Sequence, residues 1–201
     1  MPGFTLNIAV DALLKKEFDL YRSKGEPHPL MVKHGLNAVP FKHPDLDKWR
    51  ANFEGIEYHH KPTNLILTGA VDDLWVTPER KLIVVDYKAT SKDGEVTLDD
   101  EWKEGYKRQM EIYQWILRGM SFDVQDTGYF VYANGRKDVA GFNGVLCFFV
   151  TLIPYEADSS WVEKAVFDAA ACLKSDSLPA GAPDCEFCAY RKSIRIVETA
   201  S

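Results

Sequence analysis

The spacing of hydrophobic residues predicts three helices. Apolar positions recur every three or four residues in 5–22, which predicts a helix at the start of the chain. Residues 23–47 are rich in proline and glycine and predict a long irregular connection, with a short helix near 44–53. Helical spacing returns in 98–119 and 159–174. The apolar positions of the first helix are Leu6, Val10, Leu13, Leu14 and Phe18.

Strand patterns lie between these helices. Residues 64–76 are predicted to form a strand interrupted at Gly69, and 81–90 a second strand whose apolar centre is typical of a buried sheet. A turn between them predicts an antiparallel hairpin, and two more strands are predicted at 128–133 and 145–154. This order of helices and strand pairs predicts an α/β (α+β) fold with a mixed central β-sheet flanked by helices.

The chain length and organisation predict one domain. The chain has 201 residues and can bury a sizeable core without a disulfide or a metal ion. We expect a single domain over 1–201, with an N-terminal helix at 5–22, a core at 64–174 and a cysteine-containing tail at 175–201.

Composition excludes several classes of protein. The chain has 24 basic and 30 acidic residues, a net charge of −6, and 46% hydrophobic residues. These values exclude disordered and fibrous proteins, and a nucleic-acid binder that depends on bulk positive charge, although a local basic groove remains compatible. No apolar run approaches the roughly 18 residues of a membrane span, and the first residues do not resemble a signal peptide. We therefore expect a cytoplasmic protein with no membrane partner.

The residues with candidate chemistry follow the apolar runs of the predicted hairpin. Asp86 and Lys88 are two positions apart on a strand, so their side chains leave the same face. A hairpin that turns near Pro78 brings Asp72 close to Asp86. Two such carboxylates repel each other unless a cation lies between them, and oxygen ligands suit Mg²⁺ or Mn²⁺. Lys88 could then orient a water or neutralise charge on a phosphate. A solvated ion pair is the alternative interpretation of Asp-x-Lys taken alone.

The helix that follows adds two polar residues. Gln109 and Tyr113 are four positions apart and therefore share a helical face. The glutamine amide can donate to and accept from a nucleotide, and the tyrosine can stack or form a hydrogen bond. The alternative is an ordinary amphipathic helix with Tyr113 packed in the core.

Three motifs, in this order and spacing, resemble the RecB-type branch of the PD-(D/E)XK nuclease superfamily: Gly69-Ala-Val-Asp72, Asp86-Tyr-Lys88 and Gln109-x-x-x-Tyr113. That branch includes the nuclease domains of RecB and AddB and CRISPR-associated RecB-like exonucleases with cysteine clusters. The resemblance implies a restriction-endonuclease-like core and a DNA nuclease that hydrolyses phosphodiester bonds with Mg²⁺ or Mn²⁺.

The resemblance also implies a set of metal ligands. Asp72 and Asp86 would bind the metal, and the carbonyl of Tyr87 would complete its shell. The family usually supplies a His or Glu from the N-terminal helix. Asp11 is the candidate ligand from that helix here, and Glu17 is the alternative.

The resemblance assigns the other residues to catalysis and to binding of DNA. Lys88 would position the attacking water, while Gln109 and Tyr113 would help to place the DNA strand. The implied activity is that of an exonuclease or a single-strand or end-directed nuclease. Two alternatives stay open, namely an endonuclease on the same fold and a non-catalytic DNA-binding or scaffold module within a larger DNA-processing complex.

The cysteines depart from the family pattern. Relatives often hold an iron–sulfur cluster with one cysteine before the first helix and three near the C-terminus. Here Cys185 and Cys188 match two of the latter three, and no cysteine precedes Cys147. Cys147 and Cys172 lie in apolar segments and are predicted to be buried. We therefore expect no iron–sulfur cluster in this chain, with Cys185 and Cys188 as free thiols or the remnant of a site.

Overall fold

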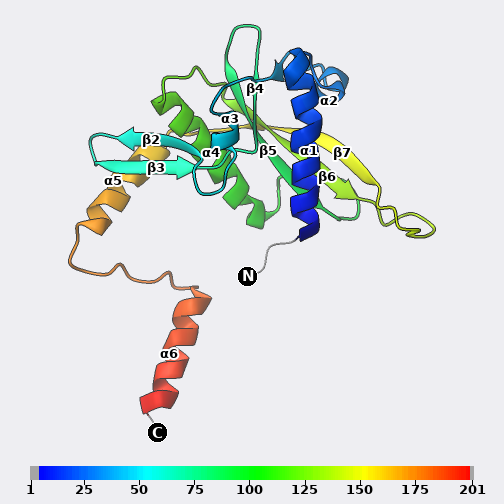
Figure 1. The fold of residues 1–201 in the computed structure, drawn as a ribbon. Helices are drawn as coiled ribbons and strands as arrows, with labels where there is room; N and C mark the ends of the chain where they lie inside the picture. The colour runs from blue at the N-terminus through cyan, green and yellow to red at the C-terminus, as the bar shows by residue number, and fades with distance from the viewer. Residues whose placement is uncertain (1–4, 200–201) are drawn as a thin grey trace. The chain divides into compact units, whose positions relative to one another are not determined.

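The computed structural model describes residues 5–199 (Figure 1). The chain divides into two compact units, Met1–Glu163 and Lys164–Ser201. The first unit contains every strand, and the second contains most of helix α5 (Val162–Leu173) and all of helix α6 (Glu186–Thr199). Over residues 5–199, every helix is too short or too polar to cross a membrane.

A five-stranded sheet forms the centre of the first unit, in the order β1-β4-β5-β6-β7. Strands β5 and β6 are parallel and the other neighbours are antiparallel, so the sheet is mixed, as predicted. A separate antiparallel hairpin pairs β2 with β3. The strands are β1 (Val39–Pro40), β2 (Ile56–His60), β3 (Leu65–Gly69), β4 (Asp73–Val76), β5 (Leu82–Thr90), β6 (Thr127–Gly135) and β7 (Phe148–Glu156).

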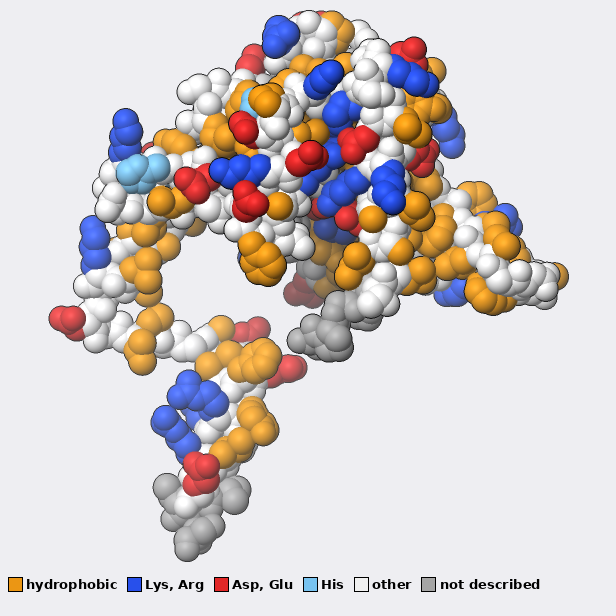
Figure 2. All heavy atoms as spheres, viewed as in Figure 1, with side chains coloured by type: hydrophobic (Ala, Val, Ile, Leu, Met, Phe, Trp, Pro, Cys, Tyr) orange, Lys and Arg blue, Asp and Glu red, His pale blue; other side chains and the backbone are white. Residues whose placement is uncertain are grey.

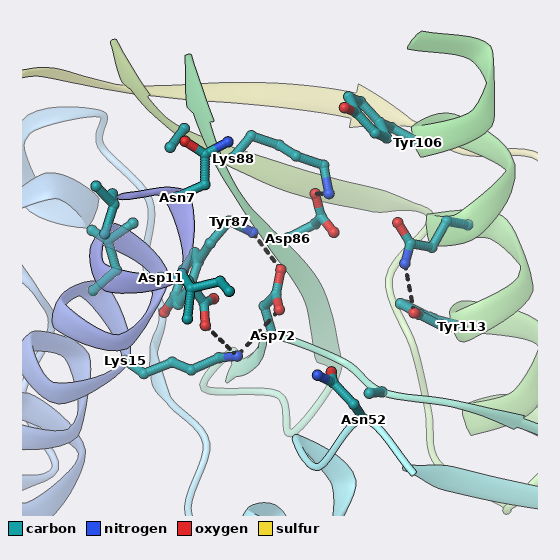
Figure 3. A pocket seen from close by; sticks show the side chains of 16 residues that line it. Asn7, Asp11, Lys15, Asn52, Asp72, Asp86, Tyr87, Lys88, Tyr106 and Tyr113 are labelled. Atoms are coloured by element: carbon teal, nitrogen blue, oxygen red, sulfur yellow. Dashed lines mark hydrogen bonds and ion pairs between the residues drawn. The ribbon is translucent and has the colours of Figure 1, made fainter. Parts of the chain in front are cut away.

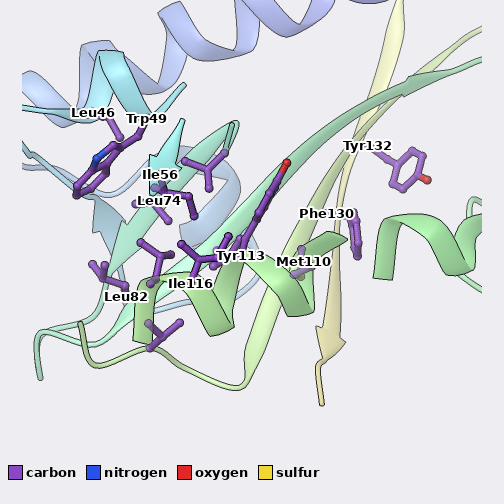
Figure 4. Close-up of a cluster of buried hydrophobic side chains, with 14 of the residues drawn as sticks. Leu46, Trp49, Ile56, Leu74, Leu82, Met110, Tyr113, Ile116, Phe130 and Tyr132 are labelled. Carbon is purple, nitrogen blue, oxygen red and sulfur yellow. The ribbon is translucent and has the colours of Figure 1, made fainter. Parts of the chain in front are cut away.

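Helices cover both faces of this sheet. Successive side chains of β5 alternate between the faces, so Val84 packs in a core with helix α4 while Val85 packs in a second core with helix α1. The α4 core is drawn in Figure 4. The predicted α+β fold with helices on a mixed sheet is therefore confirmed. The helices of the first unit are α1 (Thr5–Lys24), α2 (Pro29–Lys33), α3 (Leu46–Trp49), a 3₁₀ turn (Glu101–Lys103) and α4 (Glu104–Gly119).

Helix α1 buries a narrower stripe than the sequence predicts. Val10, Leu14 and Phe18 are buried at a spacing of four residues, whereas Leu6 and Leu13 are 57% and 63% exposed. Because side chains four apart lie nearly above one another, this spacing defines one face, and Leu13 belongs to another. Three of the five predicted apolar positions of α1 are therefore buried.

The segment 64–76 is not one interrupted strand. Its first part forms β3, which pairs with β2 (Ile56–His60), and its second part forms β4 in the central sheet. The chain changes sheet just after Gly69. Strand β2 and helix α6 were not predicted, because β2 has only five residues, with two adjacent histidines at its end, and α6 lies in a stretch with many polar residues.

The two cysteines predicted to be buried are both exposed. Cys147 precedes β7 in the connection from β6, where Val145 and Leu146 are also exposed. Cys172 lies on α5 two positions after the buried Ala170, on a different side of the helix. Apolar neighbours in sequence do not bury a residue when the element extends beyond the core.

Candidate active site

A cleft opens where β4 stops pairing with β5. The last antiparallel pair is Asp73 with Val85, while β5 continues to Thr90. Helix α1 on one side and helix α4 on the other enclose a cavity of about 680 Å³ at this point (Figure 3). Its lining includes Asn7, Asp11, Lys15, Asn52, Asp72, Asp86, Tyr87, Lys88, Tyr106, Gln109 and Tyr113.

The hairpin brings the two predicted metal-binding carboxylates together. The observed register pairs Asp73 with Val85, so the next positions along the two strands are Asp72 and Asp86, as predicted. The backbone N–H of Tyr87 donates to Asp72 Oδ2 at 2.8 Å. Because the N–H and C=O of one strand residue project to the same side, the Tyr87 carbonyl also faces the cleft edge.

Asp86 is a buried carboxylate with one incompletely satisfied oxygen. Its exposure is 5%, and its Oδ2 has no hydrogen-bond donor among the described residues. Lys88 Nζ lies 2.5 Å from Oδ2 and forms an ion pair with it. Burial, with a smaller contribution from the Asp72 carboxylate, raises the pKa of Asp86 to about 7 against the lowering effect of Lys88. A cation in the cleft would stabilise the ionised form.

Lys88 extends into the cleft from the same face as Asp86, as its spacing predicted. Its ammonium also lies 4.3 Å from the ring centroid of Tyr106 on α4, which is within the range of a cation–π contact. The Asp86 carboxylate and the Tyr106 ring thus hold this charge at the centre of the cleft. Sequence reasoning did not identify Tyr106, although it lies three residues before Gln109 on the same helix.

Helix α1 contributes Asp11 and Lys15 to the cleft. Lys15 Nζ contacts Asp11 Oδ2 at 2.9 Å and Asp72 Oδ1 at 3.3 Å. Burial raises the pKa of Asp11, and repulsion by Asp72 adds to the effect. Lys15 was not identified from the sequence, although it is four residues after Asp11. The alternative ligand Glu17 lies away from the cleft, 2.9 Å from the imidazole of His28.

Burial of Lys15 favours its neutral form, but the carboxylates of Asp72 and Asp11 outweigh this effect and raise its pKa. Lys15 therefore remains a cation at neutral pH. The Lys15 side chain is 22% exposed, so solvent reaches it only in part.

Gln109 and Tyr113 lie together on the α4 side of the cleft. Gln109 Nε2 donates to Tyr113 Oη at 2.7 Å. The tyrosine ring packs in the α4 core, so its burial agrees with the core interpretation, while its hydroxyl faces the cleft (Figures 3 and 4). Burial raises the pKa of Tyr113, so the hydroxyl is neutral.

The glycine of the first motif is explained by this tyrosine. A Cβ on Gly69 would lie 2.3 Å from Cε1 of Tyr113, whereas a Cβ on Gly105, also on α4, would meet nothing within 4 Å. The close approach of β3 to α4 therefore requires a residue without a side chain at position 69.

We expect Gly69→Ala to lower the free energy of unfolding by about 1–3 kcal/mol, because Tyr113 must shift out of the core. Gly105→Ala is the matched control and should be neutral or stabilising by about 0.5–1 kcal/mol, since alanine favours a helix. Urea denaturation measures both. Equal stability of the two variants would contradict the packing explanation.

A buried charge network lies directly beside the cleft. Asp73 is fully buried and accepts from Arg22 Nη2 at 2.5 Å, Arg50 Nη2 at 2.8 Å and the Tyr87 hydroxyl at 2.7 Å. These contacts join α1, the segment after α3 and β5 to the first residue of β4. They hold the neighbouring Asp72 at the mouth of the cleft.

Adjacent aspartates should therefore respond differently to the same substitution. We expect Asp73→Asn to lower the free energy of unfolding by about 3–5 kcal/mol, because it leaves Arg22 and Arg50 with only the part-exposed Asp19 among the carboxylates that they share in the described residues. Asp72→Asn should change stability by less than about 1 kcal/mol, since this side chain is part-exposed at the cleft. Thermal and urea denaturation of the two variants compare these effects, and a stable Asp73→Asn protein would contradict this assignment.

The chemistry of the cleft fits a hard divalent cation. Two carboxylates and the Tyr87 carbonyl offer oxygen ligands, which Mg²⁺ and Mn²⁺ prefer. The buried Oδ2 of Asp86 accepts no hydrogen bond from the described residues. The charged lining residues are Asp11, Asp72, Asp86, Lys15 and Lys88, so three negative and two positive charges leave a formal charge of −1. Within residues 5–199, no three His, Cys, Asp or Glu side chains form a ready-made metal cluster.

The mixed sheet between α1 and α4, with an Asp-x-Lys strand at its centre, defines a restriction-endonuclease-like domain. The sequence profile of the PD-(D/E)XK nuclease superfamily matches residues 9–193, and the chain belongs to this superfamily. Its members are generally nucleases and typically use divalent metals such as Mg²⁺. Searches of curated proteins and of solved structures gave no significant match.

Proposed function

We propose that this protein is a metal-dependent deoxyribonuclease of the RecB-type branch that acts on DNA ends or single strands. The observation that carries the proposal is the convergence of Asp72, Asp86 and Lys88 in one cleft, with the Asp86 carboxylate buried against the Lys88 ammonium. A solvated surface pair would have no reason to bury Asp86 in this way. The catalytic residues proposed here all lie in the first unit.

Each side chain would have a distinct part in hydrolysis. Asp72, Asp86 and the Tyr87 carbonyl would hold Mg²⁺ or Mn²⁺, with Asp11 as the further candidate ligand from α1. A bound divalent cation supplies charge stabilisation at the phosphate and makes a coordinated water more acidic. Lys88 would orient the attacking water and offset the negative charge that develops on the phosphate.

The opposite wall of the cleft would contact the nucleic acid. Gln109 donates to the Tyr113 hydroxyl, which leaves the amide oxygen and the second amide hydrogen of Gln109 available to a strand. Acidic and basic side chains are mixed over the face shown in Figure 2. Duplex binding along a long track requires many unopposed cations, so this surface favours a short contact with an end or a single strand.

A cleavage assay tests this function. We expect the protein to degrade end-labelled linear or single-stranded DNA with Mg²⁺ or Mn²⁺, to lose activity in EDTA, and to leave covalently closed circular duplex DNA intact. Asp72→Asn should remove activity while the protein stays folded. Cleavage of the circular duplex would identify an endonuclease instead. A non-catalytic scaffold would show neither cleavage nor metal binding.

We also propose that the chain carries no iron–sulfur cluster. Cys185 precedes α6 and Cys188 lies in its first turn, where the Cys188 N–H donates to Cys185 Sγ at 3.4 Å. Tetrahedral metal or cluster sites need four ligands, and this pair supplies two. We expect a colourless protein without stoichiometric iron. A brown preparation with about four irons per chain would contradict this prediction.

A further inference from the structure

The α1 side of the cleft holds a cation that belongs to the protein. Lys15 Nζ lies 2.9 Å from Asp11 Oδ2 and 3.3 Å from Asp72 Oδ1, so the ammonium stands between two carboxylates (Figure 3). The other oxygen of Asp72 accepts from the Tyr87 N–H. Asp72 is therefore fixed at both oxygens, by a side chain from α1 and by the backbone of β5.

This position of Lys15 has a consequence for metal binding. Two carboxylates that face each other across a gap form half of a typical site for a hard cation. Asp11 and Asp72 have this relation, and the repulsion between them contributes to the raised pKa of Asp11. The Lys15 ammonium lies in the gap, so it satisfies both carboxylates without a metal ion.

The formal charge of the cleft also favours the binding of a single divalent cation. With Lys15 and Lys88 charged, the three carboxylates of the lining leave a formal charge of −1, which one divalent cation more than offsets. Without Lys15 the formal charge would be −2, and a second divalent cation could bind between Asp11 and Asp72. The Asp86 carboxylate, whose Oδ2 forms an ion pair with Lys88, lies on the other side of Asp72 from Lys15, where the first cation would bind.

We propose that Lys15 takes the place of a second metal ion, so that the cleft binds a single divalent cation, and that Lys15 positions Asp72 for that cation. This inference rests on the proposed function, because it assumes a metal at Asp72 and Asp86. Lys15 affects metal binding through the position of Asp72. It would also supply a fixed positive charge to a bound phosphate, on the side of the cleft opposite Lys88.

The count of bound Mn²⁺ ions tests the inference without reference to DNA cleavage. We expect the wild-type chain to bind one Mn²⁺ in equilibrium dialysis and in titrations followed by the electron paramagnetic resonance of free Mn²⁺. Lys15→Met keeps the length of the side chain and removes its charge, and should raise the count to two. The double variant with Asp11→Asn should return it to one. Lys15→Arg, which retains the charge, should stay at one.

Lys16→Met is the matched control, because Lys16 is the exposed neighbour on the same helix and should leave the count at one. Circular dichroism checks that each variant is folded, and Lys15→Gln repeats the measurement if Lys15→Met is not. Two ions in the wild type, or one ion in both neutral Lys15 variants, would overturn the inference while leaving the nuclease proposal intact. A wild-type chain that binds no Mn²⁺ would overturn the proposed function and this inference together.

Discussion

Replacing Asp86 by asparagine should abolish DNA cleavage and, in the metal-free protein, raise the free energy of unfolding at pH 8. The first effect follows because the substitution removes an anionic ligand from the proposed metal site. The second follows because Asp86 is buried, and burial makes its ionised form costly in the folded state despite the ion pair with Lys88.

The pH dependence of this stability difference has a definite sign. Burial raises the pKa of folded Asp86 to about 7, whereas in the unfolded chain this carboxyl group has its ordinary pKa of 3.8. Between these values the folded protein holds a proton that the unfolded chain has lost, so this contribution to stability is complete below about pH 4 and is lost as the pH rises through 7. Each pKa unit corresponds to about 1.4 kcal/mol. The asparagine variant should therefore match the wild type near pH 4 and exceed it by a few kcal/mol at pH 8.

Urea denaturation in EDTA across this pH range measures the effect. Asp99→Asn is the control, because Asp99 is exposed on the surface and its substitution should change stability little at any pH. A difference between Asp86→Asn and the wild type that stays constant with pH would contradict the buried-carboxyl explanation. Saturating Mg²⁺ should reverse the order of stability, since only the wild type keeps the full ligand set.

Replacing Lys88 by methionine should lower the rate of DNA cleavage by about 10²–10³-fold, the usual effect of removing one group that stabilises developing charge. Metal binding should persist and strengthen, because the Lys88 ammonium lies 2.5 Å from Asp86 Oδ2 and competes for that oxygen. Methionine is similar in length and can contact the Tyr106 ring through its sulfur in place of the cation–π contact. The expected signature is thus a loss of turnover with retained metal affinity.

Single-turnover cleavage and Mn²⁺ titration separate these two effects. Lys81→Met serves as the control, because Lys81 lies just before the other end of β5 and pairs only loosely with Asp123 at 4.0 Å. Its activity and metal affinity should equal those of the wild type. Loss of metal binding in Lys88→Met, or wild-type cleavage by it, would place the catalytic lysine elsewhere.

The sequence alone was enough to predict the central hairpin and the positions of its polar residues. A turn of fixed length sets the register of a hairpin, and a shift by one residue would move every side chain to the wrong face. For this reason the pairing of Asp72 with Asp86, and the shared face of Asp86 and Lys88, followed from local patterns. The helical spacing of Gln109 and Tyr113 was likewise a local property, and the structure joins them by a hydrogen bond.

Only the tertiary structure decided what faces that hairpin. Helix α1 has apolar residues on more than one side, and its rotation depends on contacts far away in sequence, such as the bond from Arg22 to Asp73. That rotation directs Asp11 and Lys15 into the cleft and leaves Leu13 exposed. Periodicity reports that a helix has an apolar side, but not which of two such sides is buried.

The position at which the chain passes from one sheet to the other was also decided by tertiary packing. The sequence predicts one strand over 64–76 with an interruption at Gly69, yet the two parts belong to different sheets. At Gly69, β3 lies so close to α4 that the ring of Tyr113 fills the space of a Cβ. Contacts of this kind join residues more than forty positions apart. Hydrophobic patterns and turn residues give information about neighbours along the chain. The positions of α1 and α4 on the two sides of the cleft depend instead on packing between residues far apart in sequence.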